Sequence, residues 1–198
     1  MSHERGFQLV ELVVALAILA IVAFIAAPPL LSASAALRVE LAATELASAL
    51  HHARSLAVRH SRNVGVRFYP EPENGRVGFA LFKDGDRDGV RNADIVAGID
   101  PPLTPVRYFT HFGGRVGFGF PPGPPPRDPG NPRRRLDRLT DPIRFNGSEL
   151  ASFDPVGGST PGSLYVSDGR RHLSVVRLHG RTGKLRILRW DPDADVWR

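Results

Sequence analysis

The feature that most constrains the fold of this chain is the stretch of residues 12–31, which contains no charged side chain. Roughly 20 consecutive apolar residues form a helix long enough to cross the hydrocarbon core of a bilayer. A secretory signal peptide has a shorter apolar core that ends at a small-x-small cleavage site. Here the apolar stretch begins abruptly after Gly6 and continues into a further helical segment. We therefore expect a retained membrane helix over residues 7–31.

Glu11 is the one acidic residue near the start of this apolar segment. An unpaired carboxylate inside a bilayer costs at least a few kcal/mol, so such residues need a partner or access to water. One interpretation gives Glu11 a cationic partner within the membrane or an assembly. The other places it near the interface, where its side chain reaches water. The residue alone leaves both open.

Positions 6–11 read GFQLVE and closely resemble the processing signal of type IV pilins and pseudopilins. The resemblance implies that a prepilin peptidase removes the leader, residues 1–6, by cutting after Gly6. It also implies methylation of the new amine on Phe7 and retention of the apolar helix. Glu11 would then neutralise the N-terminal amine of a neighbouring subunit, since two charges that are costly alone in lipid are tolerable as a pair. Gln8 stands where the family usually has threonine.

Pro28 and Pro29 interrupt the apolar helix, because proline removes an intrahelical hydrogen bond. In the pilin family a proline near this place bends or locally melts the helix, and Pro28 matches that position. Alternatively, the pair ends the membrane helix at the interface. Under both interpretations the helix resumes at Ser32.

Residues 32–62 are rich in Ala, Leu, Glu and Arg and contain no Gly or Pro, which favours helix. An apolar stripe recurs at spacings of four and three through Leu46, Leu50, Ala53 and Ala57. Such a stripe is typical of a helix that packs against a sheet. We expect this segment to be an amphipathic helix of the globular domain.

From residue 63 onwards, short apolar runs alternate with turn residues, as in a β-rich domain. We predict strands over residues 64–69, 77–82, 106–110, 116–120, 143–145, 164–167, 173–178 and 185–190. Helix followed by many strands predicts an α+β pilin fold, with a long N-terminal helix packed on a β-rich sandwich over residues 63–198. Within it, residues 119–142 are dense in proline and arginine, so we expect an extended or disordered surface loop there that buries no core.

Three further stretches resemble the GspH/FimT family of minor pseudopilins and pilins: the helix-to-strand sequence ELASALHHARSLAVRHSRNVGVRF, the acidic FKDGDRDGVRNADI and the terminal LHGRTGKLRI. The resemblance implies a structural subunit that primes or caps the type II secretion pseudopilus. The alternative is a FimT-like minor pilin used in type IV pilus biogenesis and DNA uptake. Implied partners are other pilin or pseudopilin subunits, the prepilin peptidase and the inner membrane. The chain would cross the inner membrane once, with its globular domain in the periplasm.

The formal net charge of +6 comes almost wholly from arginine and suggests anionic partners. A cluster of basic residues near the C-terminus, with strand-like alternation, predicts a phosphate-tracking face that could bind DNA. An ordinary basic surface or a protein-facing patch is the alternative. The candidate DNA-binding residues are Arg177, Arg181, Lys184, Arg186 and Arg189.

Asp84, Asp86 and Asp88 form a D-x-D-x-D-G string like that of calcium loops. The twelfth position is Ile95 in place of a bidentate glutamate, and neighbouring arginines oppose a divalent ion, so a polar hairpin loop is the competing interpretation. We expect no other metal site and no cofactor. The sequence contains no cysteine, no nucleophile elbow, no phosphate loop and no H-E-x-x-H motif, so we expect no enzymatic activity.

Overall fold

The computed structural model describes residues 9–69, 78–113, 115–180 and 182–198. It divides into two compact units, Met1–Ala35 and Ala36–Arg198. Helix α1, Leu9–His60, begins in the first unit and supplies the remaining turns to the second. The second unit contains every strand that the described residues form.

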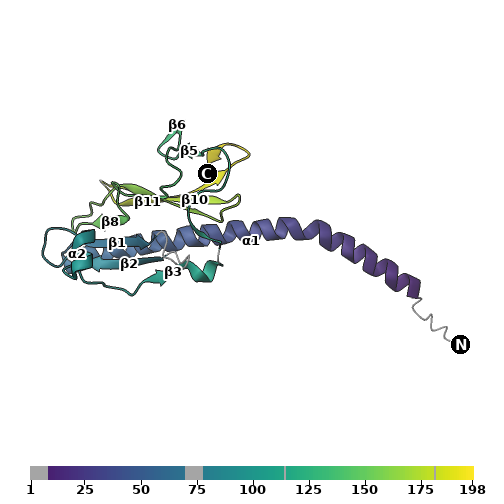
Figure 1. The fold of residues 1–198 in the computed structure, drawn as a ribbon, viewed down its shortest axis with the longest axis horizontal. Coiled ribbons are helices and arrows are strands. Elements are labelled where there is room, and N and C mark those ends of the chain that lie inside the picture. Colours follow the sequence, from purple (N-terminus) through teal and green to yellow (C-terminus); the bar gives the residue numbers. More distant parts are fainter. Residues whose placement is uncertain (1–8, 70–77, 114, 181) are drawn as a thin grey trace. The chain divides into compact units, whose positions relative to one another are not determined.

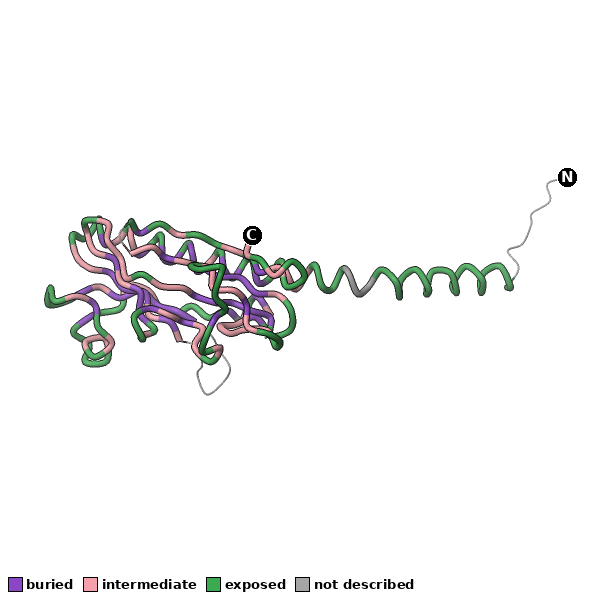
Figure 2. Tube along the Cα trace, turned by 90° about the horizontal axis from the view of Figure 1, so that it is seen from above, coloured by how far each residue is buried: buried purple, intermediate pink, exposed green. Residues whose placement is uncertain are grey.

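In the first unit, the described side chains of α1 up to residue 26 are all exposed (Figure 2). This part of the helix is long and apolar enough to cross a membrane, as predicted. The assigned helix continues through Pro28 and Pro29, so the interpretation in which the pair ends the helix is wrong. The helix ends at His60, where Ser61 adopts a left-handed φ of 49° and Arg62 N–H closes the last turn on Ala57.

Two antiparallel sheets make up most of the second unit (Figure 1). Sheet A has the order β3-β2-β1-β8, and sheet B has the order β12-β11-β10-β9-β4, with β7 also paired to β9. The strands of sheet A are β1 (Val64–Tyr69), β2 (Gly78–Lys83), β3 (Arg107–Tyr108) and β8 (Leu150–Phe153). Those of sheet B are β4 (Gly117–Phe118), β7 (Ile143–Arg144), β9 (Gly162–Ser167), β10 (Leu173–His179), β11 (Lys184–Asp191) and β12 (Val196–Trp197).

The main core joins the inner faces of both sheets to α1. The predicted helical stripe is confirmed, because Leu46, Leu50, Ala53 and Ala57 are all 0% exposed. Alternate residues of the strands meet them, since side chains along a strand point to opposite faces. Phe68 of β1 meets Phe118 of β4 edge to face with ring centroids 5.8 Å apart, so the two sheets also contact each other directly. The α+β architecture is as predicted.

The segment 119–142 is folded onto sheet B, so its prediction as a loop without core residues is wrong. It forms a hairpin of β5 (Arg127–Asp128) and β6 (Asn131–Arg135), on the side of β10 and β11 opposite α1 (Figure 1). Leu136 is only 6% exposed and belongs to a second apolar cluster with Tyr165 and Trp190. Phe120 and Leu139 of the same segment pack against this cluster, so three apolar residues among the prolines and arginines attach the segment to sheet B.

Other elements differ from the prediction in length or were not predicted. The strand expected over residues 106–110 shortens to β3 and continues as the 3₁₀ helix η1 (Phe109–Phe112). The strand expected over residues 116–120 shortens to β4. Helix α2 (Asn92–Ala97) and strands β8 and β12 were not expected, because each is a short element stabilised by tertiary contacts.

Candidate assembly helix, acidic loop and basic face

The processing signal lies at the start of α1. Gly6 and Phe7 lie outside the described residues. Glu11 lies in the first turn of α1, where a negative side chain complements the positive end of the helix dipole, and it is exposed. Pro28 lies inside α1. Because every described apolar side chain around Glu11 is exposed, this face of the helix is available to lipid or to neighbouring helices.

The three aspartates of the predicted calcium string do converge. Their carboxylate oxygens lie within 4.8 Å of one another, with Asp84 buried and Asp86 and Asp88 exposed. Asp84 is only 2% exposed, and its two oxygens accept hydrogen bonds from Arg87 N–H at 2.6 Å and Gly89 N–H at 3.1 Å. The loop thus uses Asp84 to hold its own backbone.

Asp100, which was not among the predicted site residues, holds the same loop from its C-terminal side. It is 0% exposed, and its carboxylate accepts hydrogen bonds from Gly85 N–H at 2.9 Å and Arg91 N–H at 3.0 Å. Arg91 also pairs with Asp88. Partial desolvation, a hydrogen bond with Asp86 and the negative charge of that residue raise the pKa of Asp88, although Arg91 opposes the shift. Nothing in the local sequence pattern distinguishes Asp100, because its partners lie nine and fifteen residues away.

The predicted basic residues of the C-terminal strands do not all share one face of sheet B. Arg177 lies opposite Arg186 in the β10–β11 register, and Lys184 follows on the same face as Arg186. Arg189, which is an odd number of residues from Arg186, lies on the face toward α1, where it lines a cavity with Glu40 and Thr44 of the helix. Several of the candidate residues, Arg177, Lys184 and Arg186, therefore share one face as the alternation predicted, whereas Arg189 does not. Arg181 lies outside the described residues.

The remaining basic side chains differ in whether they pack against other parts of the chain or are exposed without an ion-pair partner. The guanidinium of Arg177 is packed against Gly130 in the β5–β6 turn, where any Cβ would overlap it. Lys184 and Arg186 are exposed and, among the residues that the structure describes, have no ion-pair partner. The free positive charge on this face is therefore concentrated on β11.

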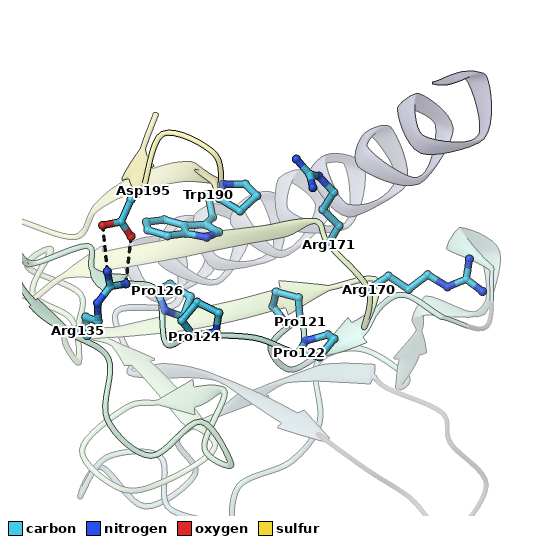
Figure 3. A pocket seen from close by; sticks show the side chains of 10 residues that line it. Pro121, Pro122, Pro124, Pro126, Arg135, Arg170, Arg171, Trp190 and Asp195 are labelled. Atoms are coloured by element: carbon cyan, nitrogen blue, oxygen red, sulfur yellow. Dashed lines mark hydrogen bonds and ion pairs between the residues drawn. The ribbon is translucent and has the colours of Figure 1, made fainter. Parts of the chain in front are cut away.

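A groove of about 540 Å³ lies beside this region, between the segment 121–126 and the end of β11 (Figure 3). Its lining residues are Pro121, Pro122, Pro124, Pro126, Arg135, Arg170, Arg171, Trp190, Pro192 and Asp195. Prolines contribute ring carbons and no N–H donors, so the walls are rigid and mainly apolar. The groove has no signature in the sequence, because segment 121–126 and the end of β11 are more than 60 residues apart in the chain.

Asp195 at the rim of the groove holds the β5–β6 hairpin to the C-terminus. It accepts hydrogen bonds from Arg135 at 3.0 and 3.1 Å and from Arg127 Nε at 2.8 Å (Figure 3 shows the Arg135 pair). Partial burial by itself raises the pKa of Asp195, but the hydrogen bonds and charges of Arg135 and Arg127 outweigh it and hold the pKa below the usual range. Trp197 Nε1–H also donates to the carbonyl of Arg127 at 2.6 Å.

Tyr165 belongs to the second apolar cluster, which segment 119–142 covers. Burial raises its pKa to about 12, although the positive charge of Arg144 opposes the shift. The Arg144 guanidinium lies 5.4 Å from the centre of the Tyr165 ring. This arrangement keeps the phenol neutral and gives it a packing role.

Comparison with known families identifies both parts of the chain. The prokaryotic N-terminal methylation motif matches residues 1–27, which include the predicted cleavage site and Glu11. The model of the family described as type II transport protein GspH matches residues 42–180, well over half of the chain. Comparison with curated proteins and with solved structures found no significant match. With its apolar N-terminal helix, its α+β domain and these two matches, the chain belongs to the GspH family of type IV pilin-like proteins.

Proposed function

We propose that this protein is a minor pseudopilin, a structural subunit that primes or caps the type II secretion pseudopilus and so supports protein secretion. The observation that carries the proposal is the combination of a methylation motif over residues 1–27 with a GspH-family domain over residues 42–180. The family consists of structural subunits, and we propose that this chain likewise has no enzymatic activity.

Processing would begin with prepilin peptidase cleavage after Gly6 and methylation of Phe7. The mature helix would remain in the inner membrane as a single span, with the domain from residue 63 onwards in the periplasm. Glu11 would then pair with the N-terminal amine of a neighbouring subunit. The physical support is that an exposed carboxylate at the start of the uncharged segment of α1 needs a cation when that segment is surrounded by lipid or other helices.

Mass spectrometry of the mature N-terminus tests the processing step. We expect loss of residues 1–6 and a methyl group on Phe7. Gly6→Asp should leave the full-length precursor, whereas Ser2→Asp, the same type of change elsewhere in the leader, should be processed normally. An intact Met1 in the wild-type chain, or cleavage far beyond Gly6, would contradict the proposal.

A deletion strain tests the system to which the subunit belongs. We expect loss of extracellular enzymes from the medium, restored by the wild-type chain and not by the Gly6→Asp chain. Normal secretion combined with loss of pilus-dependent DNA uptake would instead support the FimT-like alternative. The comparisons do not favour that alternative, and the separation of Arg189 from Lys184 and Arg186 weakens the single basic stripe that motivated it.

A further inference from the structure

Strand β11 has an open edge over half of its length. It pairs with β10 at six positions, from Lys184 to Arg189. On its other side, β12 pairs only with Trp190 and Asp191, and Arg189 exchanges both backbone hydrogen bonds with Arg198. The described part of the chain offers no partner to the outer edge of β11 before Arg189.

The hydrogen-bond pattern shows which groups this edge presents. In an antiparallel sheet, successive residues direct their backbone N–H and C=O groups alternately to the two neighbouring strands. Arg189 directs its groups to Arg198, away from β10. Ile187 and Leu185, two and four residues earlier, therefore direct theirs to the same open edge. Together they present two N–H donors and two C=O acceptors.

The side chains around this edge differ on the two faces. On the outer face, Lys184 and Arg186 are exposed and carry unpaired positive charge. On the face toward α1, Ile187 is 39% exposed. Next to Ile187 lies a cavity of about 310 Å³ whose other walls include Glu40 and Thr44 of α1. The edge therefore combines a basic outer side with an apolar residue beside a recess on its inner side.

We propose that the edge of β11 at Leu185 and Ile187 docks an extended segment of another pilin-like subunit. The segment would add one strand to sheet B and alternate carboxylate side chains on its outer face with apolar side chains on its inner face. This inference rests on the proposed function as a filament subunit, and it names the surface and the chemistry by which the globular domain joins a neighbour.

Charge determines which strand can bind. Proteins commonly protect an exposed edge with charged residues, which repel further strands. On the outer face of this edge the exposed charges of Lys184 and Arg186 have one sign, so a basic strand is repelled and an acidic strand is attracted. Opposite charges on facing strands attract at the short separation of cross-strand neighbours. The edge is therefore protected against self-pairing of β11, since a second copy would bring Lys184 and Arg186 against identical charges.

Photo-crosslinking in the full-length chain tests the proposal in membranes that contain the assembled filament. p-Benzoylphenylalanine replaces Ile187 in one variant and Val156, which is 94% exposed in a loop, in the control. We expect a light-dependent adduct between position 187 and another pilin-like subunit, at a segment that alternates acidic and apolar residues. Position 156 should give no such adduct.

Two pairs of variants test charge and backbone separately. With the probe at 187, Arg186→Glu should reduce the adduct at least about fivefold, while Arg133→Glu, the same change on exposed β6, should not. With the probe moved to Arg189, Ile187→Pro should abolish the adduct, because proline removes the outward N–H. Ile187→Thr keeps that N–H and should retain most of the adduct. Thermal unfolding of each variant checks that the domain remains folded.

N-terminal processing and recovery with the filament are measured in the same samples. A processed, incorporated chain that gives no adduct at 187, or an adduct that Arg186→Glu leaves unchanged, would overturn this inference and leave the proposed function intact. An adduct only to lipid or nucleic acid would also overturn it. A wild-type chain that is not incorporated would overturn the proposed function and this inference with it.

Discussion

Replacing Asp84 by alanine should destabilise the globular domain far more than replacing its neighbour Asp86. Asp84 is 2% exposed and accepts hydrogen bonds from the backbone N–H groups of Arg87 and Gly89. A buried donor left without an acceptor costs about 1–3 kcal/mol. Because water can enter the loop and partly replace the carboxylate, we expect a total loss of about 3 kcal/mol for the two donors.

Asp86 is the matched control within the same string of aspartates. It is exposed, and the backbone hydrogen bond that its carboxylate accepts is a long one, from Asp88 N–H at 3.3 Å. Substitutions at such surface positions usually change stability by less than about 0.5 kcal/mol. For a chain of this size, about 1 kcal/mol shifts the melting temperature by about 2–4 °C. We therefore expect Tm to fall by about 6–12 °C for Asp84→Ala and by no more than about 2 °C for Asp86→Ala.

The assay is thermal unfolding of the full-length protein in detergent, with calcium and with a chelator. If Asp84 mainly holds the loop backbone, the loss should be the same under both conditions. Asp100→Ala should behave like Asp84→Ala, since Asp100 is 0% exposed and also accepts two backbone N–H groups. Equal losses for Asp84→Ala and Asp86→Ala, present only with calcium, would refute this reasoning and establish a calcium loop.

Four other predictions concern the buried face of α1, the carboxylates of Glu11 and Asp195, and the segment 119–142. Leu50→Ala, at a position 0% exposed, should lower the free energy of unfolding by about 2–5 kcal/mol, as measured by chemical denaturation. In the same measurement Leu41→Ala, at a position 48% exposed, should lower it by less than about 1 kcal/mol. Glu11→Ala should still be cleaved after Gly6, as shown by mass spectrometry, but should fail to enter the filament; normal recovery with the filament would contradict its assembly role. Asp195→Asn should lower Tm at pH 7. The difference from wild type should shrink once the pH falls below about 4 and vanish when the pH passes below the lowered pKa of the folded state, because the carboxyl stabilises the fold only while it is ionised. Leu136→Ala should cost about 2–4 kcal/mol and speed trypsin cleavage within residues 127–138, whereas unchanged stability would mean that the segment is not anchored as described.

The features that the sequence alone determined depend on spacing along the chain. The uncharged run, the carboxylate at Glu11 and the stripe through Leu46 and Leu50 are local patterns, because a helix brings residues three and four apart onto one face. The same holds for the longest strands, in which apolar residues alternate. These patterns were sufficient for the α+β class, for the pilin resemblance and for the helical face that packs on the sheets.

The tertiary structure decided everything that depends on which distant segments meet. Arg177 faces Arg186 only because of the β10–β11 register, and Arg189 is separated from them because side chains on successive residues of a strand point to opposite faces. The burial of Asp100 and Leu136 likewise depends on partners far away in the chain. The open edge of β11 exists because β12 is short, which no local pattern encodes. Helix and strand periodicity come from backbone geometry within a segment, whereas register and pairing come from contacts between segments, and only the folded chain specifies those contacts.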